Sequence, residues 1–145
     1  VSFFLTFFAL LRLSSLFYGE GETMSRTILI VDDQPASLAL LKITLKRHKF
    51  KVLTCHSGDE ALAIINQLGC DLVIIDLMMP DMNGIELCQR IRAQSEYAQI
   101  PIIIYSAAQH LDNARRSLEA GANCFLTNTP GIQNQLLTKI RALLD

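Results

Sequence analysis

The chain of 145 residues contains no tryptophan, and only 7% of its residues are aromatic. Its net charge of −1 leaves it without the basic surface on which nonspecific nucleic-acid binding depends. The four cysteines form no Cys-x-x-Cys pair, and the three histidines follow no metal-ligand spacing. These absences argue against a zinc site and against a disulfide framework. We therefore expect free thiols in a reducing compartment, the cytoplasm.

The longest apolar run comprises the first eighteen residues, which a polar Gly-Glu-Gly-Glu-Thr segment separates from Met24. As a helix the run would be about 27 Å long, slightly short of the roughly 30 Å core of a bilayer. Arg12 lies past its middle, where a charge is costly, and a signal peptide's basic leader is missing. We expect residues 1–23 to be a hydrophobic leader or a misassigned upstream segment. A membrane-associating helix and an apolar arm are the alternatives, and residues 24–145 are expected to form one domain.

From Thr27 onward, short apolar runs alternate with amphipathic segments. The runs are rich in β-branched residues without strict polar alternation, which is typical of strands covered on both faces in a parallel sheet. Such alternation predicts right-handed crossovers and a doubly wound α/β fold. The predicted strands are residues 28–31, 51–55, 71–76, 101–106 and 123–127.

The amphipathic segments carry helix start and stop signals. Pro35 suits the first turn of a helix, and Ser57 followed by Glu60 predicts a capping box. The helix after Ser57 is expected to bury Leu68 together with residues 61, 64 and 65, while Gly121 ends a later helix. The remaining predicted helices cover residues 84–94 and 111–120 and a last stripe from Ile132 to Leu143.

Three acidic residues follow predicted strands. Asp32 and Asp33 come after the first strand, and Asp76 ends the third. If those strands are neighbours, their ends lie about 4.8 Å apart, and carboxylates that close repel by about 3 kcal/mol per pair. A hard divalent cation such as Mg²⁺ would offset this repulsion. The alternative is that the three side chains only cap a helix and a turn.

The segments LIVDDQP, DLVIIDLMMPDMNG, PIIIYSA and GANCFLTNTP resemble the receiver domains of response regulators in bacterial two-component signalling, across residues 27–144. The resemblance implies a flavodoxin-like fold with five parallel strands in the order 2-1-3-4-5. It implies that Asp76 accepts a phosphoryl group and that Asp32 and Asp33 hold Mg²⁺ together with the backbone carbonyl of Met78.

The same resemblance assigns roles to neighbouring residues. Ser106 matches the hydroxyl residue that bonds the phosphoryl group, and Phe125 matches the aromatic residue whose rotamer reports the switch. Pro80 and Gly84 would shape the turn after the phosphoacceptor. A hydroxyl that follows a new phosphate can move its loop, so a local charge change would bias a two-state element.

The chain departs from the family pattern at the end of the fifth strand. Asn128 stands where receiver domains carry a lysine that pairs with the phosphoacceptor. An amide can donate hydrogen bonds but brings no charge, so phosphorylation or its transmission is expected to be weaker. Met78 and Ala108 flank the phosphoryl site, and neither can orient an attacking water, so any phosphate is expected to hydrolyse slowly.

The expected function is that of a phosphoacceptor receiver served by a histidine kinase or a histidine phosphotransfer protein. By resemblance, the fourth predicted helix, the fifth strand and the last helix would form the output or dimer face, and the contact candidates are His110, Arg115, Arg116 and the exposed side of the last helix. Two alternatives remain open. One is a pseudo-receiver that binds proteins without phosphorylation, which Asn128 favours. The other is an aspartate-nucleophile phosphatase, which the adjacent placement of the acidic pair opposes, so we expect a signalling domain and no enzyme.

Overall fold

A computed structural model describes residues 25–107 and 111–145. The expected leader at residues 1–23 lies outside the described residues, as do Ala108 and His110. In the described ranges, no helix combines the length and apolar character needed to cross a membrane. All four cysteines lie within them and are free, as expected from their spacing.

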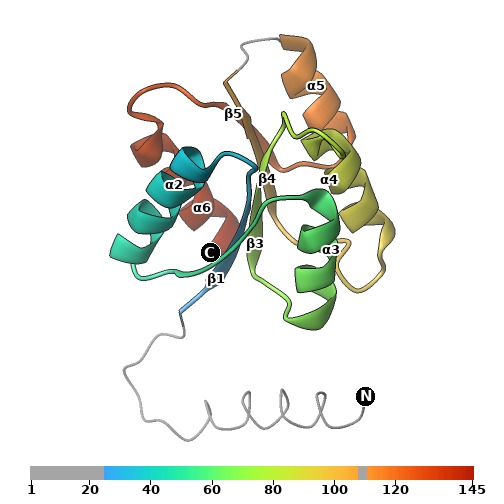
Figure 1. The fold of residues 1–145 in the computed structure, drawn as a ribbon, viewed down its shortest axis with the longest axis horizontal. Helices are drawn as coiled ribbons and strands as arrows, with labels where there is room; N and C mark the ends of the chain where they lie inside the picture. The colour runs from blue at the N-terminus through green and yellow to red at the C-terminus, as the bar shows by residue number, and fades with distance from the viewer. Residues whose placement is uncertain (1–24, 108–110) are drawn as a thin grey trace, which may run out of the picture.

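Parallel strands form a single sheet in the order β2-β1-β3-β4-β5, which confirms the predicted flavodoxin-like topology (Figure 1). The chain first crosses to one side of β1 and then returns to its other side. The carboxyl ends of β1 and β3 therefore flank the switch in winding direction, where open α/β sheets bind their ligands. The strands are β1 (Thr27–Val31), β2 (Lys51–Cys55), β3 (Leu72–Asp76), β4 (Ile102–Ser106) and β5 (Cys124–Thr127).

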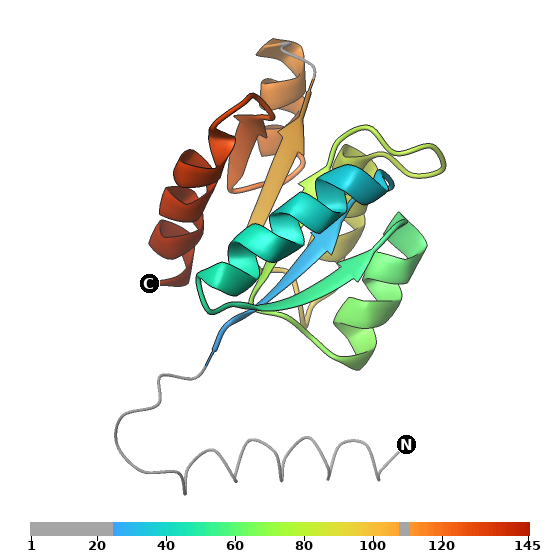
Figure 2. The same ribbon diagram turned by 60° about the vertical axis from the view of Figure 1, so that its left-hand side comes forward.

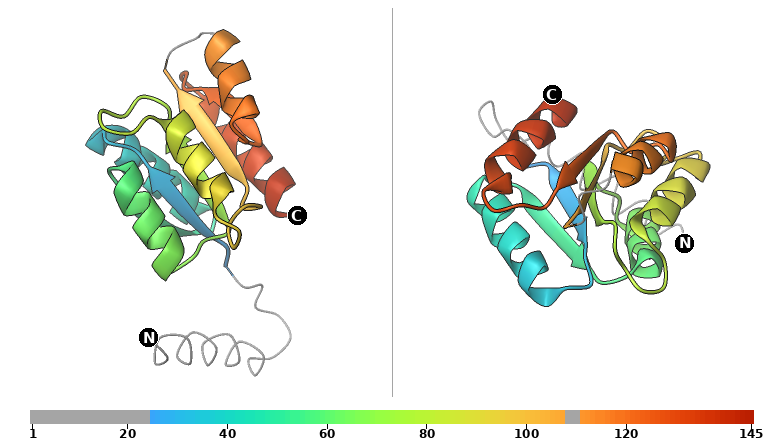
Figure 3. Two further views of the ribbon diagram at one scale, coloured as in Figure 1. Left: turned by 90° about the vertical axis from the view of Figure 1, so that its right-hand side faces the viewer. Right: turned by 90° about the horizontal axis from the view of Figure 1, so that it is seen from above.

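Helices cover both faces of the sheet (Figures 2 and 3). On one face α2 (Pro35–Arg47) lies beside α6 (Ile132–Leu144), and both contribute to the wall of a common cavity. The opposite face carries α3 (Gly58–Gln67), α4 (Gly84–Ala93) and α5 (Leu111–Glu119). This arrangement explains why the central strands are apolar along their whole length, because both of their faces are buried.

The core is divided by the sheet into two clusters of buried side chains. Successive residues of a strand point to opposite faces, so neighbours in the sequence enter different clusters. Ile104 packs toward α3 and α4, for example, whereas Tyr105 packs toward α2 and α6. The face toward which a side chain at a strand end points therefore depends on this alternation.

Local sequence signals place most of the helix ends. Pro35 is the first residue of α2, and the Ser57 hydroxyl accepts a hydrogen bond from the Glu60 N–H at 3.2 Å. The second half of the predicted capping box differs, because the Glu60 carboxylate accepts from the His56 N–H, one residue before the cap. Leu68 was expected to be buried but is 48% exposed, because α3 ends at Gln67 and Leu68 is its C-cap.

Candidate functional site

The three acidic residues converge at the carboxyl edge of β1 and β3. Val31 pairs with Ile75 in the register of the two strands, so Asp32 and Asp76 both follow directly after a paired position. Oxygen atoms of Asp32, Asp33 and Asp76 all lie within 4.8 Å of one another. The register of two neighbouring strands, fixed by buried apolar side chains, thus brings three carboxylates together.

Asp32 is held from two directions. Its side chain is 1% exposed, and its Oδ1 accepts a hydrogen bond from the Gln34 N–H at 2.9 Å. Its Oδ2 accepts a hydrogen bond from the hydroxyl of Tyr105 in β4. The bond to Gln34 is the kind of local cap that the alternative interpretation predicted, yet it uses only one of the two carboxylate oxygens.

Tyr105 had no predicted role, because it was treated only as part of the apolar run of β4. One signal could have identified it. A tyrosine within a strand that is buried on both faces needs a partner for its hydroxyl. At the carboxyl end of the sheet, a neighbouring carboxylate is a suitable acceptor.

Asp76 is 8% exposed and lies beside two other carboxylates. Burial raises the pKa of Asp76 to about 7, and the negative charges of Asp32 and Asp33 act in the same direction. A hydrogen bond from the Met78 N–H, at 3.2 Å from Oδ1, opposes that rise in pKa. Near neutral pH the Asp76 carboxyl of the metal-free cluster is therefore partly protonated, as expected for close carboxylates that cannot all stay charged.

Asp33 supplies evidence that the site suits a cation. Its Oδ1 is buried and has no hydrogen-bond donor among the described residues. A buried acceptor without a donor is costly unless another positive group meets it. All ligand atoms in the cluster are oxygen, which hard cations such as Mg²⁺ prefer. The residues therefore fit a divalent cation better than they fit a set of caps.

The turn after Asp76 needs a glycine at its end. The Gly84 N–H donates to the Leu77 carbonyl at 3.0 Å, which closes the turn. A Cβ atom added to Gly84 would lie 2.7 Å from the backbone oxygen of Asp76. Asn83 then caps α4 by accepting from the Glu86 N–H at 2.9 Å. In this way the turn is fixed directly beside the proposed phosphoacceptor, with the Met78 side chain 64% exposed at its start.

Ser106 and Phe125 lie on the adjacent strands β4 and β5. Ser106 ends β4 and is fully buried, and its backbone carbonyl accepts from the Asn128 N–H at 2.7 Å. Phe125 is half-buried and packs against the cluster that faces α3 and α4. The backbone hydrogen bond from Asn128 links the ends of β4 and β5, so a displacement of Ser106 would also displace residue 128.

Asn128 is exposed and borders the cavity between α2 and α6. Over residues 25–107 and 111–145, no hydrogen bond joins its side chain to the carboxylates, and no salt bridge reaches Asp32, Asp33 or Asp76. Arg115 of α5 pairs with Asp112 at 2.6 Å and with Glu119 at 3.2 Å. The acidic cluster is thus assembled without a cationic partner from the described part of the chain.

The chain was compared with known families and proteins. The family model of the response regulator receiver domain matches residues 28–141. The DNA-binding response regulator MtrA of Mycolicibacterium smegmatis is 35% identical over 85% of this chain and 52% of its own length. The DNA-binding dual master transcriptional regulator RpaA of Synechocystis is 33% identical over 81% of this chain and 48% of its own. The chain therefore spans about half the length of these relatives.

Solved structures of similar proteins share the fold. The signal receiver domain of a histidine kinase from Syntrophus aciditrophicus has a TM-score of 0.76 and 32% identity, covering 83% of this chain and 90% of that one. The chemotaxis response regulator CheY4 of Vibrio cholerae has a TM-score of 0.77 and 28% identity, covering 83% of this chain and 100% of its own.

Proposed function

Because the chain belongs to the response regulator receiver family, we propose that it accepts a phosphoryl group on Asp76. The observation that carries this proposal is the convergence of Asp32, Asp33 and Asp76 within 4.8 Å at the switch point of the sheet. No stability argument requires such a cluster, because three close carboxylates repel one another. An attacking carboxylate beside a cation site is what phosphoryl transfer requires.

In this proposal the residues have different roles in cation binding, phosphoryl transfer and switching. Asp32, Asp33 and Asp76, with the backbone carbonyl of Met78, would hold Mg²⁺, which neutralises charge on the phosphoryl oxygens when it is bound. Asp76 attacks phosphorus through a carboxylate oxygen and forms a new P–O bond. The P–N bond of a phosphohistidine, or the P–O bond of an acyl phosphate, breaks, and the imidazole or the carboxylate of the donor leaves with the bonding electron pair. The backbone turn closed by Gly84 keeps the attacking carboxylate in place. Ser106 would then bond the new phosphate and, through its link to Asn128, displace the ends of β4 and β5.

The proposed partners follow from the same site. A histidine kinase or a histidine phosphotransfer protein would donate the phosphoryl group. The output face would comprise α5, β5 and α6, where Leu111 is 92% exposed and Leu118 is 51% exposed. The MtrA relative is described as DNA-binding, and the alignment covers 52% of its length, so for the receiver domain described here we propose protein partners. Its free cysteines favour a reducing compartment, which supports the cytoplasm.

One experiment tests the proposal directly. The full chain is incubated with Mg²⁺ and a small acyl phosphate, and its intact mass is recorded over time. We expect the mass to rise by one phosphoryl group in the wild type and not in Asp76→Ala. The matched control is Asp81→Ala, which removes an exposed carboxylate from the turn that follows and should label like the wild type. Labelling that persists in Asp76→Ala would contradict the assignment.

The second candidate function is a pseudo-receiver that binds partners without phosphorylation. The observation that favours it is the exposed Asn128, whose side chain makes no bond to the cluster in the described residues. Binding of Mg²⁺ without any labelling, and without a response to beryllofluoride as a phosphate mimic, would support this function instead. A phosphatase is less suitable, and absence of general phosphatase activity is the expected result.

A further inference from the structure

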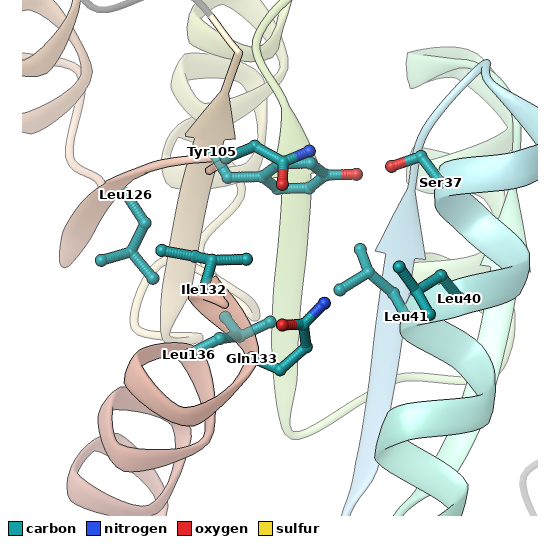
Figure 4. Close-up of a pocket in the computed structure, with 9 residues that line it drawn as sticks. Ser37, Leu40, Leu41, Tyr105, Leu126, Ile132, Gln133 and Leu136 are labelled. Atoms are coloured by element: carbon teal, nitrogen blue, oxygen red, sulfur yellow. The ribbon is translucent and has the colours of Figure 1, made fainter. Parts of the chain in front are cut away.

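Tyr105 is a polar side chain inside an otherwise apolar strand. It lies in β4, immediately before Ser106, and its side chain is 6% exposed. Figure 4 shows its ring across the cavity between α2 and α6, with Leu126 on one side and Leu41 on the other. A phenylalanine would fill the same space, so the hydroxyl needs a separate explanation.

The hydroxyl connects three elements of the fold. It donates to Oδ2 of Asp32, which follows β1. Ser37 lies in the first turn of α2, and Figure 4 shows the Tyr105 hydroxyl directed toward the Ser37 side chain. Because Oδ1 of Asp32 accepts from the Gln34 N–H, both oxygens of this buried carboxylate are fixed. One of the proposed cation ligands thus has its orientation determined by a residue of β4.

The charge of the cluster gives this bond a further consequence. The described residues place no cationic side chain against the three carboxylates, and Asn128 is exposed at the end of β5. A hydroxyl donor lowers the repulsion among the carboxylates by taking up part of the negative charge of Asp32. It also limits the rotation of Asp32, which would otherwise cost entropy when a cation binds.

We propose that Tyr105 is a positioning residue, which orients Asp32 for divalent cation binding and gives the acidic cluster a hydrogen-bond donor where no cationic side chain of the described residues reaches it. The proposal rests on the proposed function for the identity of the cation as Mg²⁺. It assigns Tyr105 no contact with the cation or with phosphate. Since Ser106 follows Tyr105 directly in β4, the strand that would respond to the phosphate also holds a cation ligand in place.

The test measures Mg²⁺ affinity of the full chain by titration calorimetry. Removing the hydroxyl in Tyr105→Phe should weaken Mg²⁺ binding about tenfold, the usual size of an effect transmitted through a metal ligand. The matched control is Tyr97→Phe, which removes a hydroxyl that bonds the Asn66 carbonyl at 3.5 Å, far from the cluster in the fold. This control should bind Mg²⁺ like the wild type.

Two further variants separate positioning from simple destabilisation. In an Asn128→Lys background, the loss caused by Tyr105→Phe should shrink to about threefold or less, because a cation would then supply charge to the cluster. Ser37→Ala removes the side chain toward which the Tyr105 hydroxyl is directed, and it should weaken Mg²⁺ binding by about two- to threefold. If Tyr105→Phe does not fold, the Ser37→Ala titration decides alone, and an unchanged affinity there counts against the proposal.

The outcomes remain distinct from those of the proposed function. An Mg²⁺ affinity of Tyr105→Phe equal to that of the wild type overturns the inference, even if Asp76 is labelled normally. An equal loss in Tyr97→Phe would also overturn it, because the effect would then be a general one. A selective loss in Tyr105→Phe supports the inference even in a protein whose Asp76 is never labelled.

Discussion

The carboxyl edge of the sheet has two halves that differ in what they retain of a receiver site. The half built by β1 and β3 places three carboxylates together, with Asp32 1% exposed and Asp76 8% exposed. The half built by β4 and β5 places a buried Ser106 beside an exposed Asn128. The comparison shows that the acidic cluster is assembled by strand register and hydrogen bonds. It does not require a cation from the fifth strand.

The two halves also differ in the packing around them. The helices next to the acidic half bury several large apolar side chains, such as Leu41 and Leu45 in α2. In α5, which follows β4, the described side chains include only Ser117 as a buried residue. Segments with few buried apolar contacts open at low free-energy cost. A firmly packed acidic half beside the sparsely packed α5 is the arrangement expected of a domain with a two-state element.

The largest expected effect comes from restoring charge to the second half. Asn128→Lys should raise the rate of Asp76 labelling by an acyl phosphate roughly 30-fold. A unit charge at 4 Å is worth about 4 kcal/mol at an effective dielectric near 20, and solvent exposure removes about half of that. The rate is measured by intact mass at saturating Mg²⁺.

The control for this change is Asn134→Lys, which adds the same charge at an exposed position of α6. That variant should label at the wild-type rate. An equal rise in both variants would show that net charge attracts the donor, and no rise in either would show that Asn128 does not limit labelling. Either result would contradict the idea that the half built by β4 and β5 limits labelling because it lacks a positive charge.

A second prediction concerns pH and the acidic half. Because the pKa of Asp76 is raised to about 7, the folded state binds a proton more tightly there than the unfolded chain does. In the metal-free protein the contribution of Asp76 to stability is fully present below the ordinary carboxyl pKa, and it is lost as the pH rises through about 7. Asp76→Asn removes this loss. It should raise the free energy of unfolding at pH 8 by about 2 kcal/mol, roughly half of the full shift.

Urea unfolding in the presence of a chelator, at pH 5 and at pH 8, measures this difference. The gain should be less than half as large at pH 5, because the loss of stability accrues between the ordinary carboxyl pKa and the raised pKa of Asp76 and is only partly developed there. Asp81→Asn, which neutralises an exposed carboxylate of the same loop, should show no such pH-dependent gain. A gain of equal size at both pH values would mean that the repulsion at Asp76 is not the cause.

The sequence predicted the acidic half better than the other half, for physical reasons. Apolar runs predict where the strands lie, and a residue at the end of a buried parallel strand lies at the carboxyl edge of the sheet. The proximity of Asp32 and Asp76 therefore followed from the pattern. The bond from Tyr105 to Asp32 depends on which strands are neighbours and on which face Tyr105 occupies. A pattern of apolar letters treats a tyrosine as core and does not show where its hydroxyl points.

The errors have a similar origin. The periodicity of α3 continued to Leu68, but the helix ends one residue earlier, and the side chain is half exposed. The predicted capping box has the Glu60 carboxylate bonding the cap residue itself, whereas in the structure it accepts from the His56 N–H. Element ends depend on such local geometry, whereas element type depends on longer patterns.

The smallest expected effect concerns the lifetime of the phosphate at the boundary between the two halves. Met78 is 64% exposed beside the turn and carries no polar group that could orient an attacking water. Met78→Asn should shorten the half-life of phosphorylated Asp76 about fivefold, the effect of one net hydrogen bond of about 1 kcal/mol. The half-life is followed by intact mass after removal of the donor. Met78→Leu keeps an apolar side chain and should decay like the wild type, so equal half-lives in all three proteins would show that water is oriented from elsewhere.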